Sequence, residues 1–305
     1  MPPAPTLDGR LICACNCAYD IAQPGKLPTD PADRYYVGAG FLNTPAAFVD
    51  ATGIHAGLVG TTPDGVVLAL RGTLSFDFHD RLSLRDWLND FAAKPVPAEW
   101  LPAGSTARVH QGFLLALDAL VAQGAFTEIN RQLQTVGAGA RLLITGHSKG
   151  GGVAPLAALR LWRTASLSSQ VVTFAAPHAG DPAFADLYSN AQIVHARYEF
   201  QDDIVPHAPP SIDGVLAQME DVPWVGSLLP GLQKYDYEPV GELRYIDWSN
   251  AVVGDSTALK LNRLAHLVEI ILGEQWDVFR LDHQIVCKAE TGYMSVACPT
   301  VVCDA

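Results

Sequence analysis

The chain has 305 residues, of which 49% are hydrophobic and 17% are charged, a composition typical of a globular protein with a sizeable core. Its formal net charge of −12 at pH 7 argues against a nucleic-acid partner, because nothing would offset repulsion by the phosphates. The same charge argues against electrostatic binding to anionic membranes. No apolar run reaches the roughly 18 residues of a membrane span, so no transmembrane segment is expected.

The two ends of the chain bear on where the protein resides. Residues 1–5 lack the basic and apolar regions of a signal peptide, so we expect an intracellular protein or the mature form of a secreted one. All six cysteines lie near the ends, at Cys13, Cys15, Cys17, Cys287, Cys298 and Cys303. We favour at least one disulfide between the ends, which would indicate an oxidising compartment, with buried thiols as the alternative. The C-x-C-x-C spacing without a nearby histidine is unlike the usual zinc sites.

The first quarter of the chain combines a broken start with a hairpin. Proline and glycine at positions 24, 25 and 28 predict an irregular or short-helical lead-in up to about residue 31. Residues 34–49 show no clean period and are interpreted as pieces of helix. Residues 55–61 and 66–70 flank the turn signal Thr62-Pro63-Asp64-Gly65 and predict a β-hairpin.

Three stretches before residue 140 have the apolar spacing of helices. Leu84, Trp87, Leu88 and Phe91 recur at helical intervals, and prolines at 95, 97 and 102 end this helix. A second helix is predicted to begin at about residue 109 and to reach residue 121, and a third to reach about residue 133.

The segment around residue 148 carries the clearest chemical signal. Residues 142–145 predict a short buried strand, and the run from Gly152 predicts a helix. Between them, Gly146-His147-Ser148-Lys149-Gly150 matches the nucleophile-elbow pattern G-x-S-x-G. A serine on so sharp a turn needs glycine two residues before and after it, and the helix N-terminus favours negative charge developing there. With 26 glycines in the chain a plain glycine-rich turn is the alternative, but the flanking strand and helix favour Ser148 as a nucleophile.

The remaining elements define the fold class. Residues 170–176 and 193–198 predict two more strands, and strands that alternate with helices indicate an α/β protein with a mainly parallel sheet. No internal repeat or linker is visible, so we expect a single domain over residues 1–305. An apolar insertion at about 211–235 is typical of a functional cover or of a packed extra hairpin. A helix with an apolar stripe is predicted over residues 256–271.

A nucleophilic serine needs a base and an acid that orients the base. In α/β-hydrolases both follow the serine, the acid first and just past a later strand. Asp202 and Asp203 both follow the strand that ends at Tyr198. One of them is expected to be the acid, and the other a solvated loop carboxylate.

Three histidines follow these acids. His207 lies too close to them in sequence to return to Ser148, and His266 shares a helix face with Arg263, opposite the apolar stripe, which indicates a surface role. His283 follows a probable helix, where a loop could deliver it to the elbow, and is therefore the expected base. Among the earlier histidines, His147 is expected to point away across the turn.

The oxyanion hole of such a site needs two backbone N–H donors. One comes from the residue after the nucleophile, which is Lys149, and the other from a loop after an earlier strand. Thr73 lies at the end of the second hairpin strand and could supply this donor, although a simple strand-ending turn is an equal alternative.

Taken together, the short motifs of this chain resemble those of class 3 (fungal-type) triacylglycerol lipases. They occur in the order seen in that family: Arg71-Gly72-Thr73, Asp86-Trp87-Leu88-Asn89-Asp90, His110-Gln111-Gly112-Phe113, Gly146-His147-Ser148-Lys149-Gly150-Gly151, Thr173-Phe174-Ala175-Ala176-Pro177 and Asp203-Ile204-Val205-Pro206-His207-Ala208-Pro209-Pro210. The resemblance covers about residues 53–210 and implies an α/β-hydrolase fold.

The resemblance also implies residue roles. Ser148 would be the nucleophile, Asp203 the acid and His283 the base, with Thr73 and Lys149 as the oxyanion hole. A lid over about residues 82–95 would present Trp87, Leu88 and Phe91 to the substrate. The chain departs from the family at Lys149, where leucine is more familiar, and in the segment after residue 210.

We therefore expect a serine carboxylic ester hydrolase, and by resemblance a triacylglycerol lipase that meets its substrate at an oil–water interface. An acyl-enzyme mechanism of this kind requires neither a metal nor an organic cofactor. The alternatives are a short-chain or feruloyl esterase, a phospholipase A1, and a catalytically silent lipid-binding module. The resemblance and the terminal cysteines favour a secreted mature form, and the sequence leaves the oligomeric state open.

Overall fold

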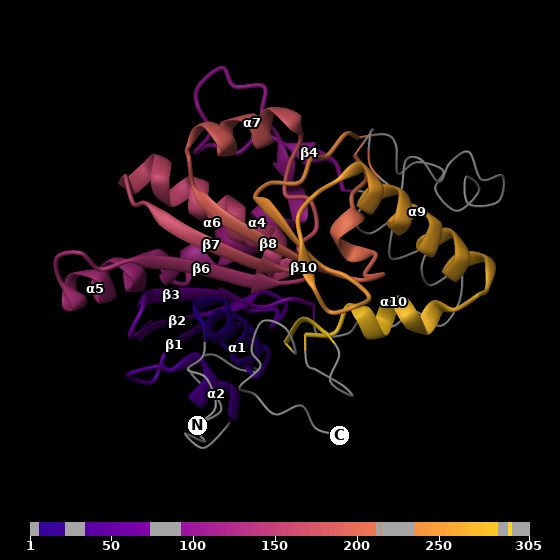
Figure 1. The fold of residues 1–305 in the computed structure, drawn as a ribbon. Coiled ribbons are helices and arrows are strands. Elements are labelled where there is room, and N and C mark those ends of the chain that lie inside the picture. The colour runs from indigo at the N-terminus through magenta and orange to yellow at the C-terminus, as the bar shows by residue number, and fades with distance from the viewer. Residues whose placement is uncertain are drawn as a thin grey trace.

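The computed structural model describes residues 6–21, 34–73, 93–211, 214, 235–285 and 292–294. The strands of its main sheet are β1 (Ala46–Val49), β2 (Ala56–Thr62), β3 (Gly65–Leu70), β6 (Leu142–His147), β7 (Ser169–Phe174), β8 (Val194–Phe200), β9 (Glu242–Ile246) and β10 (Val252–Val253). They lie in the spatial order β1-β2-β3-β6-β7-β8-β9-β10 (Figure 1). The strands from β3 to β9 run parallel, whereas β1, β2 and β10 add antiparallel edges. A small second sheet pairs β4 (Pro95–Val96) with β5 (Val109–His110).

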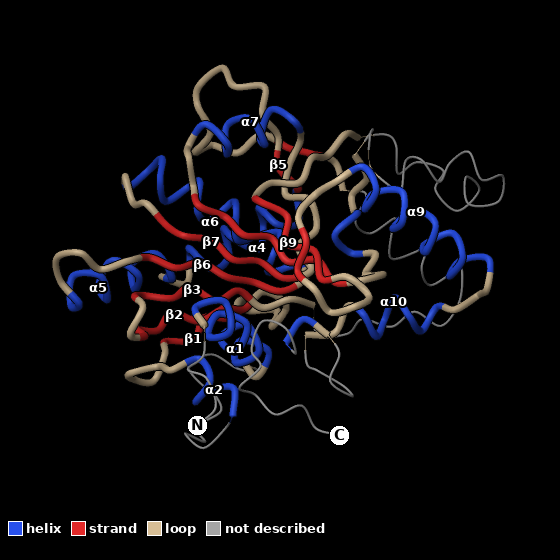
Figure 2. Tube along the Cα trace, viewed as in Figure 1, coloured by secondary structure: helices blue, strands red, loops and turns tan. Residues whose placement is uncertain are grey.

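Helices cover both faces of the sheet (Figure 2). Their bounds are α1 (Leu7–Tyr19), α2 (Arg34–Ala39), α4 (Gln111–Ala122), α5 (Ala125–Val136), α6 (Lys149–Ala165), α7 (Pro182–Asn190), α9 (Thr257–Leu272) and α10 (Trp276–Asp282). A 3-10 turn, η1 (Val205–His207), follows β8. This arrangement is the predicted α/β class, since parallel strands joined by helices must be covered on both sides.

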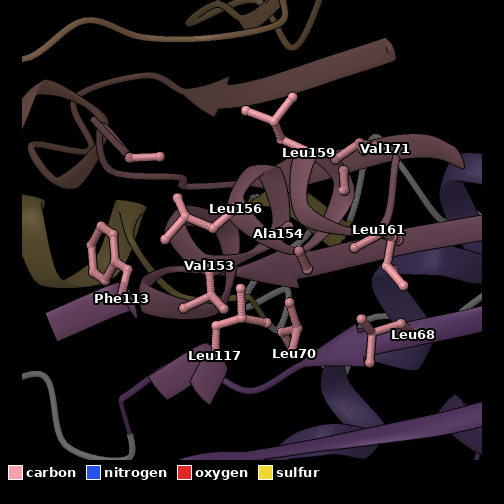
Figure 3. Close-up of a cluster of buried hydrophobic side chains, with 14 of the residues drawn as sticks. Leu68, Leu70, Phe113, Leu117, Val153, Ala154, Leu156, Leu159, Leu161 and Val171 are labelled. Carbon is pink, nitrogen blue, oxygen red and sulfur yellow. The ribbon is translucent and has the colours of Figure 1, made fainter. Parts of the chain in front are cut away.

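Neighbouring residues of β3 point into two different cores. Val67 and Ala69 pack in a cluster with α1, and Leu68 and Leu70 pack in a cluster with α4 and α6. Figure 3 shows the second cluster, where Leu68, Leu70 and Val171 meet residues of α6. All six residues of β3 are buried, which explains why this strand is a continuous apolar run in the sequence.

The predicted hairpin is confirmed, but the chain before it is more regular than expected. β2 and β3 pair antiparallel around the turn at 63–64. Of the two predictions for the lead-in, irregular or short-helical, the helical one holds for α1, a capped helix of 13 residues whose N-cap Thr6 side chain accepts from Gly9 N. The proline and glycine that suggested a break come after this helix ends at Tyr19. Residues 34–49 are helix only as α2, because β1 is recruited as an edge strand by pairing with β2.

The N-terminal cysteines all lie buried on α1. The Cys15 Sγ lies 3.1 Å from Thr145 Oγ1 in β6, and burial raises the pKa of the Cys15 thiol to about 12. Their proposed disulfide partners, Cys287, Cys298 and Cys303, lie outside the described residues, so the bridge between the ends stays a prediction.

Within the described ranges, no single helix is long and apolar enough to cross a membrane. The helices Gln111–Ala122 and Ala125–Val136 pass that test only when taken together, and they are bent by 58° relative to each other.

Phe113 anchors α4 against the elbow helix and tests the packing of the second core. It is 2% exposed, its ring stacks on His110 with centroids 3.9 Å apart, and it fills the space beside Gly152. We expect Phe113→Ala to lower the free energy of unfolding by about 3–5 kcal/mol, because the lost ring leaves a cavity. Urea denaturation measures this value. Leu115→Ala is the control, since Leu115 lies on the same helix but is 57% exposed, and an equal loss in both variants would contradict the assignment.

Candidate active site

Ser148 occupies the sharp turn between β6 and α6. Its φ of +56° and ψ of −130° lie outside the regions that residues with side chains ordinarily adopt. The flanking glycines are required by space: a Cβ on Gly146 would lie 2.2 Å from Gly150 O, and one on Gly150 would lie 2.1 Å from Leu70 O. The helix begins at Lys149, earlier than the predicted Gly152, so its N-terminus directly adjoins the serine.

The structure brings Ser148, His283 and Asp203 together. The Ser148 Oγ lies 2.9 Å from His283 Nε2, and His283 Nδ1 lies 3.0 Å from both Asp203 carboxylate oxygens. All three residues are buried, with Asp203 fully inaccessible to solvent. With Nδ1–H donating to the carboxylate, Nε2 is the acceptor for the serine hydroxyl, which is the arrangement that activates a nucleophile.

Two further donors fix the Asp203 carboxylate. The Tyr293 hydroxyl donates to Oδ2 over 2.6 Å, and Val205 N donates to Oδ1 over 3.0 Å. Tyr293 was not found from the sequence, because it lies beyond the last predicted element and no motif marks it. Its hydroxyl also accepts from Phe200 N over 3.0 Å, so one side chain joins the end of β8 to the acid.

His147 points toward His283, whereas the sequence predicts that it points away across the turn. Its Nε2 donates to the backbone carbonyl of His283 over 2.9 Å, and its Nδ1 accepts from the Tyr19 hydroxyl over 2.7 Å. Burial lowers the pKa of His147 well below its ordinary value, so the ring is neutral and this pair of roles defines its tautomer. A chain of hydrogen bonds thus runs from α1 to the backbone of residue 283.

A hydrogen bond between Asp202 and Asp282 links the turn that carries Asp203 to the segment that carries His283. The Asp282 carboxylate accepts from Asp202 N over 3.1 Å, so the residues that precede Asp203 and His283 are tied together. Asp202 is 7% exposed and accepts from Trp248 Nε1 over 2.8 Å, so the prediction of a solvated loop carboxylate is wrong. Burial and the neighbouring Asp202 and Asp203 raise the pKa of Asp282 to about 7.

The predicted surface face of α9 is only partly correct. His266 has a 41% exposed side chain, but Arg263 is buried and its guanidinium pairs with Glu199 over 2.6 Å. Arg263 also donates to His207 Nε2 over 2.8 Å, which braces the 3-10 turn after Asp203. Arg263 is buried because its guanidinium forms an ion pair with Glu199 of β8, a long-range contact that the periodicity of the sequence does not show. Conversely Leu261, an apolar residue of the same helix, is 59% exposed.

Thr73 and Gly72 lie beside the elbow. A Cβ on Gly72 would lie 2.8 Å from His147 O and 3.0 Å from Ser148 Cβ, so this chain segment passes the nucleophile at van der Waals contact. A cavity of about 140 Å³ adjoins the pair, lined by Tyr19, Thr73, His147, Arg280, His283, Gln284 and Ile285. The cavity is mostly apolar and opens next to the His283 imidazole.

Most of the predicted lid, residues 82–92, lies outside the residues that the structure describes. Trp87, Leu88 and Phe91 lie within residues 74–92, and most of the 211–235 insertion lies within residues 215–234, both outside the described ranges. Both assignments therefore stay predictions.

Part of the chain matches a known protein family. Residues 67–212 match the model of the lipase (class 3) family. The matched segment contains Ser148 and Asp203, while His283 lies beyond its end.

Individual relatives agree with the family match. The chain is 31% identical over 191 residues to a lipase of Rhizomucor miehei, covering 61% of this chain and 50% of that protein. It is 27% identical over 236 residues to the secreted mono- and diacylglycerol lipase 1 of Fusarium solani, covering 76% of this chain and 67% of that protein. The chain thus spans half the length of its Rhizomucor miehei relative.

Solved structures confirm the fold. A deletion mutant of the Rhizomucor miehei lipase propeptide complex superposes with a TM-score of 0.63 at 22% identity, over 86% of this chain and 74% of that one. The predicted α/β-hydrolase fold is therefore confirmed.

The raised pKa of Asp282 makes stability depend on pH. An acid whose pKa is higher in the folded state binds its proton more tightly there, so the free energy of unfolding falls as pH rises from about 4 to about 7. We expect Asp282→Asn to be more stable than the parent by about 1–2 kcal/mol at pH 8, with the difference vanishing near pH 4. The amide oxygen of asparagine can still accept from Asp202 N.

Chemical denaturation at pH 4, 6 and 8 measures this difference. Asp277→Asn is the control on the same helix, because its side chain is 76% exposed. Parallel stability curves for the parent and Asp282→Asn across this pH range would contradict the prediction.

Proposed function

We propose that this protein is a serine carboxylic ester hydrolase, a lipase that acts on acylglycerols through the Ser148–His283–Asp203 triad. The observation that carries the proposal is the 2.9 Å contact between Ser148 Oγ and His283 Nε2, with the other imidazole nitrogen on the Asp203 carboxylate. This geometry supports nucleophilic attack by a serine and serves little purpose in a catalytically silent module.

The reaction follows from the roles of the three side chains. His283 takes the Ser148 proton as the oxygen attacks the ester carbonyl carbon, and it gives that proton to the leaving alcohol. Water then attacks the acyl-enzyme, with His283 again as the base, and releases the carboxylate product. Asp203 holds the tautomer of His283 and stabilises the imidazolium that forms in each step.

The developing oxyanion needs preorganised donors. We assign them to the backbone N–H groups of Lys149, at the N-terminus of α6, and Thr73, beside the elbow. Losing one such donor costs about 100- to 1,000-fold in rate in comparable sites.

The relatives support the choice of substrate class. Two named relatives are a lipase and a secreted mono- and diacylglycerol lipase, which favours acylglycerols as substrates and secretion as the location. A series of p-nitrophenyl esters from two to sixteen carbons, with a phosphatidylcholine assay beside it, separates a lipase from a short-chain esterase and a phospholipase A1.

Phosphonate labelling tests the nucleophile. A p-nitrophenyl alkylphosphonate should add one phosphonyl group to Ser148, located by peptide mass spectrometry, and abolish hydrolysis of p-nitrophenyl butyrate. Ser148→Ala should neither be labelled nor hydrolyse the ester. Labelling at another residue, or retained activity in Ser148→Ala, would refute the proposal.

We further propose a single domain in which residues 82–95 act as a lid, with the apolar side chains of Trp87, Leu88 and Phe91 against the substrate. In water, a closed lid would remove these apolar side chains from solvent by covering the site. At a lipid surface, an open lid would remove them from water by contact with lipid. We expect Trp87→Ala to reduce the activation by emulsified tributyrin at least several-fold more than the hydrolysis of dissolved p-nitrophenyl butyrate.

A second tryptophan variant serves as the control for the comparison of the two substrates. Trp162→Ala, on α6 and 37% exposed, should leave the ratio of the two activities unchanged. Equal losses on both substrates in Trp87→Ala would remove the lid assignment while leaving the triad intact.

A further inference from the structure

The side chain of Lys149 makes a contact that the triad does not explain. Its backbone N–H is already assigned to the oxyanion hole, but its ammonium extends to the turn before β2. There Nζ donates to the Ile54 carbonyl over 2.9 Å and lies 3.4 Å from His55 Nδ1. This lysine stands where the motif of the family more often has leucine, so the contact is a feature of this chain.

A second cation binds the same turn. Arg71 is 2% exposed, and its guanidinium donates to Gly53 O and, over 3.3 Å, to Ile54 O. Another of its nitrogens donates to Ile21 O. The Ile54 carbonyl therefore accepts from two cations, one attached to each side of the proposed oxyanion hole.

The turn links two segments that are in close contact. Arg71 precedes Thr73 by two residues, and Lys149 directly follows Ser148. The two segments touch, since a Cβ on Gly150 would lie 3.1 Å from the Arg71 backbone carbon. Holding both side chains on one carbonyl therefore fixes the separation between the two backbone donors.

Burying the Lys149 and Arg71 charges next to each other is unfavourable in the protein without substrate. Burial and the nearby Arg71 lower the pKa of Lys149 to about 8, and Asp50 compensates only in part. His55, which also faces the ammonium, stays neutral at pH 7 because burial and Lys149 lower its pKa. Two positive charges beside one carbonyl repel each other, but they would attract the negative charge that forms at the neighbouring oxyanion hole during reaction.

We propose that the Lys149 side chain is a positioning residue for the oxyanion hole, which joins the elbow to the Arg71-bound turn and supplies positive charge beside the oxyanion. This role rests on the proposed function of the triad. It acts in the transition state, so its loss lowers kcat and leaves KM nearly unchanged.

Substitutions at Lys149 separate the effect of its side-chain charge from that of its backbone N–H donor. Lys149→Met keeps the backbone donor and most of the side-chain volume but removes the ammonium. We expect its kcat on p-nitrophenyl butyrate at pH 7 to fall about 10- to 100-fold, with KM within about twofold. Lys149→Arg keeps a charge that does not titrate below about pH 12. Lys260→Met is the control, because Lys260 pairs with Asp255 at the surface and its side chain is 57% exposed.

The pH profile provides the second readout. In the parent, kcat should fall as pH rises through about 8, because the ammonium loses its proton there. Lys149→Arg should hold its kcat up to pH 9.5, and Lys149→Met should show no decline centred near pH 8. A merely structural lysine would produce none of these differences in profile.

Two outcomes would overturn the proposal. One is a Lys149→Met variant with the kcat and pH profile of the parent. The other, which needs only the parent and Lys149→Arg and so survives misfolding of the methionine variant, is the same alkaline decline in both proteins. Phosphonate labelling of Ser148 in each variant keeps this test apart from the triad, because a failure here with normal labelling leaves the proposed function standing.

Discussion

The active site depends on how closely two backbones approach one another at the end of β3. Gly150 lies against Leu70 O and Gly72 lies against the chain beside Ser148, at distances that leave no room for a side chain at either glycine. This contact holds the strained serine turn in place, since the unusual dihedral angles of Ser148 persist only if the surroundings enforce them. It also sets the segment with Thr73, the proposed second oxyanion donor, beside the elbow.

The parallel sheet brings the remaining groups to the same edge. β6 and β8 are separated only by β7, and the carboxyl ends of all three strands lie on one side. Ser148 follows β6 and Asp203 follows β8, so the distance between them is fixed by strand spacing. His283 then has to be delivered from outside the sheet, and the bonds from His147, from Asp203 and between Asp202 and Asp282 all serve to hold it there.

Much of this site could be predicted from the sequence, because its signals are local. The elbow needs glycines at fixed offsets, the hairpin needs its turn residues, and the acid follows a recognisable strand. Tyr19, Tyr293 and Arg263 could not be found in this way. Each contributes through one long-range contact, to His147, Asp203 and Glu199 respectively, and no periodicity records such a contact. The same limit explains β1, which is a strand only because β2 lies beside it.

The order of the residues of the proposed triad along the chain has a consequence for biosynthesis. Ser148 and Asp203 follow strands β6 and β8, but the imidazole comes from residue 283 and the hydroxyl that donates to Asp203 comes from residue 293. A nascent chain that ends before residue 283 lacks the proposed base for Ser148. The proposed ester hydrolysis therefore requires a chain that has been translated past both positions.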